Sequence, residues 1–115
     1  MNTPETYYTP CTRCNRRQTE TPLQLDRSQH FHVCVDALGC LRTIKKQGYH
    51  TYIHGTSTRK QRIFALELAD QKGVDLVAFI KVELELDDIL KVSARALSAI
   101  IQGLLCKQIK AVRAA

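Results

Sequence analysis

The sequence has no tryptophan, one methionine and only 6% aromatic residues, so any hydrophobic core must be built mainly from aliphatic side chains. No uninterrupted apolar run approaches the roughly 20 residues that a membrane-spanning helix needs. The first ten residues are polar and lack the apolar stretch of a secretory signal. These absences predict a protein that does not enter a membrane and that resides in the cytoplasm.

The motifs of several enzyme classes are also missing. No Gly-x4-Gly-Lys-Ser/Thr loop and no Gly-x-Gly-x2-Gly turn is present to cradle a phosphate. Neither His-Glu-x2-His nor the His-x-Glu of the zinc deaminases occurs. Carboxylates gather between Glu83 and Asp88, but such a run is typical of a solvated acidic turn. The sequence therefore predicts that the protein is not an enzyme.

What the chain does have is an excess of positive charge. It carries 17 Lys and Arg against 11 Asp and Glu, a formal net charge of +6 over 115 residues, and the excess is spread over both halves. A positive field favours polyanions such as nucleic acid. The plainer interpretation is a soluble domain with solvated basic faces.

Four of the five cysteines fall within the first 40 residues. They form the pattern Cys-x2-Cys-x19-Cys-x5-Cys, in which the first pair has the spacing of a zinc knuckle. A disulfide framework is not expected in a reducing compartment. Because four thiolates leave zinc no open position, the predicted cofactor is a structural Zn²⁺ ion. The predicted ligands are Cys11, Cys14, Cys34 and Cys40, and Cys106 is expected to be a buried thiol in a helix.

The fourth ligand is the open point of this pattern. A second knuckle would have a cysteine at position 37, where this chain has Ala37. Cys40 is favoured because Gly39 gives the preceding loop the freedom to bring it back. One histidine shares a predicted strand face with the third cysteine, and two others have the His-x3-His spacing of a zinc-finger helix. These alternatives are His32, His50 and His54.

The apolar pattern divides the chain into a zinc-binding module over residues 1–57 and a helical module over residues 58–115. The first module has too few apolar residues to fold well without a metal. The fold class is therefore α+β, with a small zinc-stabilised β-rich module followed by a compact helical one. The elements expected in the first module are strands over 18–26, 31–34 and 49–53 and a helix over 41–47 that ends at Gly48.

Helix starts are the clearest signal in the second module. Thr58 and Gln61 form a capping box, in which the hydroxyl accepts a backbone N–H and the amide reaches back. Gly73 is expected to end that helix, and Asp75 to cap a second one. Ser93 is expected to start the longest helix of the protein.

Basic side chains near the knuckle and at the start of the helical module are candidates for contacts to phosphates. Tyrosines in the same regions could stack on bases or serve in packing. The candidate basic residues are Arg13, Arg16, Arg17, Arg42, Lys45, Lys46, Arg59, Lys60 and Arg62. The tyrosines are Tyr7, Tyr8, Tyr49 and Tyr52.

Two stretches resemble known modules. Cys11-Thr-Arg-Cys14-Asn15 followed by Phe31-His-Val-Cys34 resembles the zinc-ribbon or treble-clef modules of phage and bacterial accessory proteins, apart from Ala37. Residues 58–104 are similar to the helical tails of phage recombination and single-strand-annealing proteins and of some nucleases. The matching positions there are Thr58, Gln61, Leu66, Gly73, Val92, Ser93, Ala96, Ile100, Ile101 and Leu104. The resemblance implies nucleic-acid metabolism or a phage- or plasmid-encoded regulator.

Two functions follow from these patterns. The first is a non-enzymatic, zinc-containing accessory or regulatory protein that binds nucleic acid. The alternative is a protein-interaction module that binds and inhibits or modulates a host enzyme complex. In that case the helical module would supply the docking or homodimer surface through Val77, Ile80, Ile101, Leu104 and Leu105.

Overall fold

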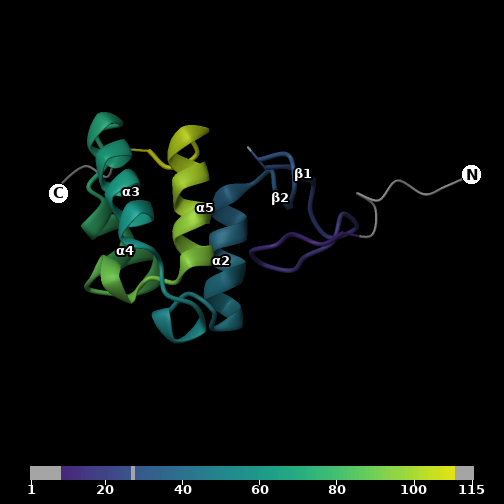
Figure 1. Ribbon diagram of the computed structural model, residues 1–115, viewed down its shortest axis with the longest axis horizontal. Helices are drawn as coiled ribbons and strands as arrows, with labels where there is room; N and C mark the ends of the chain where they lie inside the picture. Colours follow the sequence, from purple (N-terminus) through teal and green to yellow (C-terminus); the bar gives the residue numbers. More distant parts are fainter. Residues whose placement is uncertain (1–8, 27, 111–115) are drawn as a thin grey trace, which may run out of the picture.

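The computed structural model describes residues 9–26 and 28–110, and within them it has an α+β fold (Figure 1). A two-stranded sheet lies at one end and the helices lie at the other, so the predicted fold class is confirmed. No helix in these two ranges is long and apolar enough to cross a membrane. The helices are α2 (Ala37–Gln47), α3 (Arg59–Gln71), α4 (Leu76–Leu84) and α5 (Ala94–Leu105), with short 3₁₀ helices at Tyr52–His54 and Ile89–Lys91.

The sheet is an antiparallel hairpin of β1 (Leu23–Leu25) and β2 (His32–Cys34). Leu23 pairs with Cys34 and Leu25 pairs with His32. Both strands lie inside the predicted ranges but are only three residues long. Two such strands are marginal on their own. The hairpin therefore depends on what packs against the buried face of β2.

Helix α2 begins at Ala37, four residues earlier than predicted. Asp36 caps it by accepting the backbone N–H of Gly39 at 2.9 Å. A Cβ at position 39 would lie 2.4 Å from an Asp36 oxygen, so a larger residue there would force the capping side chain to shift. Gly39 thus serves the helix start, and Cys40 lies on a rigid first turn instead of on a flexible loop. The predicted end at Gly48, with φ at +82°, is confirmed.

The prediction of a strand over residues 49–53 is wrong. The start of α5 holds this segment in place: Ser93 donates its N–H to the carbonyl of His50, and Ala94 donates to that of Gly55. The chain turns between these two anchor points and forms the 3₁₀ helix Tyr52–His54. The β-prone residues of this segment are overruled by tertiary contacts.

The predicted caps of the later helices are present. Thr58, Asp75 and Ser93 each accept the backbone N–H three residues further on. The capping box is incomplete, because the Gln61 amide donates to the carbonyl of Ala94 at 3.0 Å and does not reach back to Thr58. Gln61 therefore joins α3 to α5. With 12 residues, α5 is also one residue shorter than α3, contrary to the prediction.

Helix α5 occupies the centre of the fold, between α2 and α3 (Figure 1). Its residues Leu97, Ile100 and Leu104 are fully buried. They belong to the same hydrophobic core as Ile44 on α2 and the cysteines of the first module. The predicted boundary between the two modules lies after residue 57. Among the described residues, one buried core includes side chains from both sides of that boundary.

Because α5 is central, truncation of Leu97 to alanine should destabilise the whole molecule. A buried leucine replaced by alanine typically costs about 2–5 kcal/mol in free energy of unfolding. Urea denaturation followed by circular dichroism measures this loss. The control is Leu90→Ala at a side chain that is 55% exposed, which should change stability by less than about 0.5 kcal/mol. Equal losses in the two variants would contradict the central role of α5.

Candidate metal centre

The sulfur atoms of Cys11, Cys14, Cys34 and Cys40 all lie within 4.8 Å of one another and could hold a metal ion. All four side chains are buried. The Cys14 and Cys34 sulfurs are 3.4 Å apart, and those of Cys11 and Cys40 are 3.7 Å apart. A tetrahedral site with metal–sulfur distances of about 2.3 Å has sulfur–sulfur edges of about 3.8 Å. The spacing of the sulfurs therefore fits one tetrahedral ion.

Three separate segments deliver these sulfurs. The knuckle, residues 11–14, is closed by the N–H of Asn15 donating to the carbonyl of Cys11 at 2.9 Å. Asn15 has a φ of +64°, a left-handed conformation that asparagine tolerates better than most residues. Cys34 ends β2, and Cys40 lies in the first turn of α2. The hairpin and the first turn of α2 therefore position the third and fourth sulfurs of the cluster.

The four thiols shift one another's pKa in opposite directions. Hydrogen bonding with Cys14 first, then Cys34 and Cys40, holds the pKa of Cys11 far below its ordinary value. Cys11 raises the pKa of Cys14, but Cys34 and Cys40 lower it more, to about 6. Contacts with Cys11 and then Cys14 raise the pKa of both Cys34 and Cys40 well above the ordinary value. Two thiols ionise easily and two resist, and a bound dication removes that conflict by deprotonating all four.

Arg16 supplies part of the balancing charge. Its Nε donates to the Cys14 sulfur at 3.5 Å and its Nη2 to the Cys34 sulfur at 3.7 Å. Burial alone lowers the pKa of Arg16, but hydrogen bonds and charge from the two cysteines raise it above its ordinary value. Four thiolates around a dication carry two excess negative charges. Arg16, predicted as a phosphate contact, therefore lies against the sulfurs.

The structure gathers Cys40, and not a histidine, with the other three cysteines. No histidine of the described residues belongs to the sulfur group. His32 is buried on β2, and its two ring nitrogens have no partner among these residues. Ala37 starts α2, where its N–H donates to the Gln108 side chain at 2.6 Å. This hydrogen bond attaches the start of α2 to the segment after α5.

Cys106 differs from its predicted burial. It is exposed and caps the C-terminal end of α5, which ends at Leu105. None of the five cysteines, all of which the structure describes, forms a disulfide.

Several predicted phosphate contacts are engaged within the protein. Arg13 is only 4% exposed and donates to Gln102, so it lies too deep to reach the backbone of an external nucleic acid. Arg42 forms an ion pair with Glu83 at 3.0 Å, and Lys45 forms one with Glu85 at 3.2 Å. Arg62 donates to the backbone and side chain of Ser57. The remaining candidates are exposed and form no ion pair among the described residues: Arg17, Lys46, Arg59 and Lys60.

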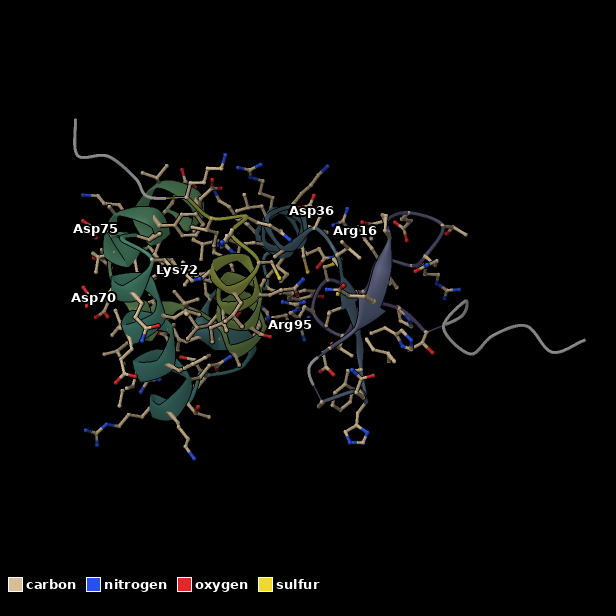
Figure 2. The ribbon with its side chains drawn as sticks, turned by 90° about the horizontal axis from the view of Figure 1, so that it is seen from above. Arg16, Asp36, Asp70, Lys72, Asp75 and Arg95 are labelled. Atoms are coloured by element: carbon tan, nitrogen blue, oxygen red, sulfur yellow. The ribbon has the colours of Figure 1, made fainter. Side chains whose placement is uncertain are left out.

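Sequence reasoning missed Arg95. Its guanidinium lies 5.0 Å from the ring centre of Tyr49, whose ring meets that of His54 edge-on at 5.0 Å. Figure 2 shows Arg95 on the side of the helices that faces the knuckle and the sheet. Its Nη1 also donates to the carbonyl of Arg13 at 3.5 Å. No sequence signal could have found this contact, because it depends on how the Tyr49 segment crosses the start of α5.

Comparison of the chain with known protein families, curated proteins and solved structures finds no match. The resemblance to phage and bacterial accessory modules therefore stays a prediction.

Loss of one sulfur should remove tight metal binding. Structural zinc sites contribute about 10–16 kcal/mol through four ligands, so Cys40→Ser should weaken zinc binding at least about a hundredfold. Elemental analysis after dialysis against a chelator measures the zinc retained per chain. Cys106→Ser, at the exposed cysteine, is the control and should keep the full zinc content. A full complement in Cys40→Ser would exclude the four-sulfur site.

Arg16 should set the metal affinity without being a ligand. Groups that hydrogen-bond to metal ligands typically contribute ten- to a hundredfold to metal affinity, so Arg16→Gln should weaken zinc binding by about that factor. Competition with a coloured chelator gives the affinity. Arg17→Gln, one position further along and exposed, should leave it unchanged. Equal affinities for the Arg16 variant and the unmodified protein would contradict the contacts to sulfur.

Proposed function

We propose that the protein is a zinc-stabilised, non-enzymatic accessory protein that binds single-stranded nucleic acid. The observation that carries the proposal is the group formed by Arg95, Tyr49 and His54, in which the guanidinium lies over the Tyr49 ring and His54 meets that ring edge-on. A hydrogen bond from Arg95 ties this group to the backbone of the knuckle. Single-stranded nucleic acid is bound by aromatic rings that stack on bases, together with cations that neutralise phosphates. Here the aromatic ring of Tyr49 and the cation of Arg95 lie next to the knuckle that holds two of the four cysteines.

Zinc is the ion that this donor set favours. Sulfur ligands in tetrahedral arrangement select zinc or iron–sulfur centres over hard cations. Four buried cysteines occupy every position of a tetrahedral ion, so the proposed role is structural. For the same reason we do not assign the centre a reaction. The free thiols of all five cysteines support a reducing compartment such as the cytoplasm.

The proposed contact face, here the knuckle face, consists of Arg17, Lys46, Tyr49, Tyr52 and Arg95. Two hydrogen bonds join its parts. The amide of Gln47, next to Lys46, donates to the carbonyl of Cys14 at 2.7 Å, and Arg95 donates to the carbonyl of Arg13. The end of α2 and the start of α5 are thereby held against the knuckle. Tyr52 is 51% exposed and Lys46 is exposed, so both are available to a strand.

A single-stranded oligonucleotide should bind with an affinity that falls steeply with salt. Lys46→Gln should reduce the slope of log affinity against log salt by about 0.7, the value for one phosphate contact to a single strand. Tyr52→Ala should weaken binding about five- to a hundredfold, since one stacked base contributes about 1–3 kcal/mol. Fluorescence anisotropy at several salt concentrations measures both effects.

The control for this assay is Phe64→Ala on α3, which is 41% exposed and lies outside the knuckle face. It should leave affinity and salt slope unchanged. Salt-independent binding, or a Tyr52→Ala variant that binds as tightly as the unmodified protein, would overturn the proposal.

A second candidate is a protein-binding role for the helical part. Ile63, Phe64 and Leu66 on α3 and Val77 and Val82 on α4 are each more than 40% exposed. Exposed apolar side chains gathered on two helices mark interaction surfaces. Of the residues predicted for this role, Ile80 and Leu104 are buried in the core and cannot serve, whereas Val77 is exposed. A homodimer through this surface is part of the same candidate.

A further inference from the structure

A groove of about 330 Å³ lies between the hairpin and α5. Its walls are apolar: Leu25 and Val33 come from the hairpin, and Ile101 and Leu105 come from α5. Arg13 is among the polar residues that line it, and we call this site the Arg13 groove. Its volume falls within the range of sites for small ligands.

Arg13 is a buried cation that forms no ion pair within residues 9–26 and 28–110. It is 4% exposed, and its Nη2 donates to the side-chain oxygen of Gln102. Its Nε and Nη1 are buried with no hydrogen-bond partner among the described residues. Guanidinium groups in protein interiors are normally paired with carboxylates or phosphates, because an unpaired buried charge is strongly unfavourable.

Nearby groups do not fill this role. Asp26 lines the same groove, but its carboxylate accepts the Ser28 hydroxyl at 2.6 Å and serves the hairpin turn. The cysteine sulfurs receive the guanidinium of Arg16, while Arg13 gives the cluster only its backbone N–H, to Cys11. Gln102 offers a neutral oxygen, and its own NH₂ group donates to the carbonyl of Cys34 at 2.8 Å.

We propose that the Arg13 groove binds a small carboxylate with an apolar body. The carboxylate takes the place of the Gln102 oxygen on Arg13 and pairs with the forked guanidinium, a geometry that favours two parallel hydrogen bonds. The apolar body packs against Leu25, Val33, Ile101 and Leu105. The groove adds a ligand site separate from the proposed nucleic-acid face. A short-chain acid and the carboxyl end of an apolar peptide share this chemistry.

The first test uses hexanoate and the zinc-loaded, full-length protein. Hexanoate should shift the amide resonances of Ser98, Ile101 and Gln102 saturably. It should also slow alkylation of Cys106, the exposed thiol that lines the groove. Hexanol lacks the charge and acetate lacks the apolar body, so each should bind at least about tenfold more weakly. Equal binding of hexanol and hexanoate, or no saturable shift with hexanoate, would overturn the proposal.

Variants locate the binding. Arg13→Gln should abolish the preference for hexanoate over hexanol. Because Arg13 lies in the knuckle, Leu25→Glu provides a second test at a side chain that is 42% exposed. The added carboxylate at the groove wall should weaken hexanoate binding at least about tenfold. Leu90→Glu, 55% exposed in the 3₁₀ helix Ile89–Lys91, is the matched control and should bind as the unmodified protein does. Unchanged binding in Leu25→Glu would place hexanoate elsewhere and refute the site.

Two further probes distinguish a short-chain acid from the carboxyl end of an apolar peptide as the ligand. N-acetyl-leucine represents the end of an apolar peptide, and N-acetyl-leucinamide is its uncharged counterpart. Tighter binding of N-acetyl-leucine than of hexanoate would support the proposal with a peptide end as ligand, and the reverse order would support it with a short-chain acid. Binding of the amide as tight as that of the acid would overturn the role of Arg13.

Discussion

Four thiols from three segments of the chain share a space in which every sulfur is within 4.8 Å of the others. Because the sulfurs are so close, ionisation of one thiol opposes ionisation of its neighbours, and the pKa values of Cys11 and Cys40 shift in opposite directions. With a dication, the same closeness becomes the source of stability, because structural metal binding contributes folding free energy directly. The knuckle, the hairpin and the start of α2 are all placed by this one requirement.

Helix α2 connects the sulfur cluster to the hydrophobic core of the rest of the molecule. Its first turn bears Cys40, and the next turns bear Leu41 and Ile44, which pack in the core shared with α5. Metal binding and apolar burial therefore act on the same rigid element. The Asp36 cap sets where α2 starts, and the packing of α2 against α5 sets how the helix lies. We expect loss of the metal to weaken the helical part as well as the hairpin, since the two share one core.

The sequence was sufficient to predict those features that depend on residues close together in the chain. The Cys-x2-Cys spacing, the caps at Thr58, Asp75 and Ser93, and the stop at Gly48 all depend on residues within a few positions of one another. Features that depend on long-range contacts were out of reach. The segment at 49–53 is shaped by bonds to Ser93 and Ala94, and Gln61 leaves its capping box for the distant carbonyl of Ala94.

Net charge was the least informative basis for predicting contacts to nucleic acid. Each basic residue adds the same formal charge to the sequence, whether its side chain is buried, paired or exposed in the fold. Arg13, Arg16 and Arg17 stand within one short stretch, yet one is buried on Gln102, one contacts the sulfurs and one is exposed. Each location suits the guanidinium to a different role. We propose that Arg13 pairs with an anion in the groove, that Arg16 balances charge at the metal centre, and that Arg17 contacts an external polyanion. The net charge of +6 therefore overstates the field available to nucleic acid. The nucleic-acid binding that we propose would therefore depend on a few exposed cations beside aromatic rings and not on the total charge.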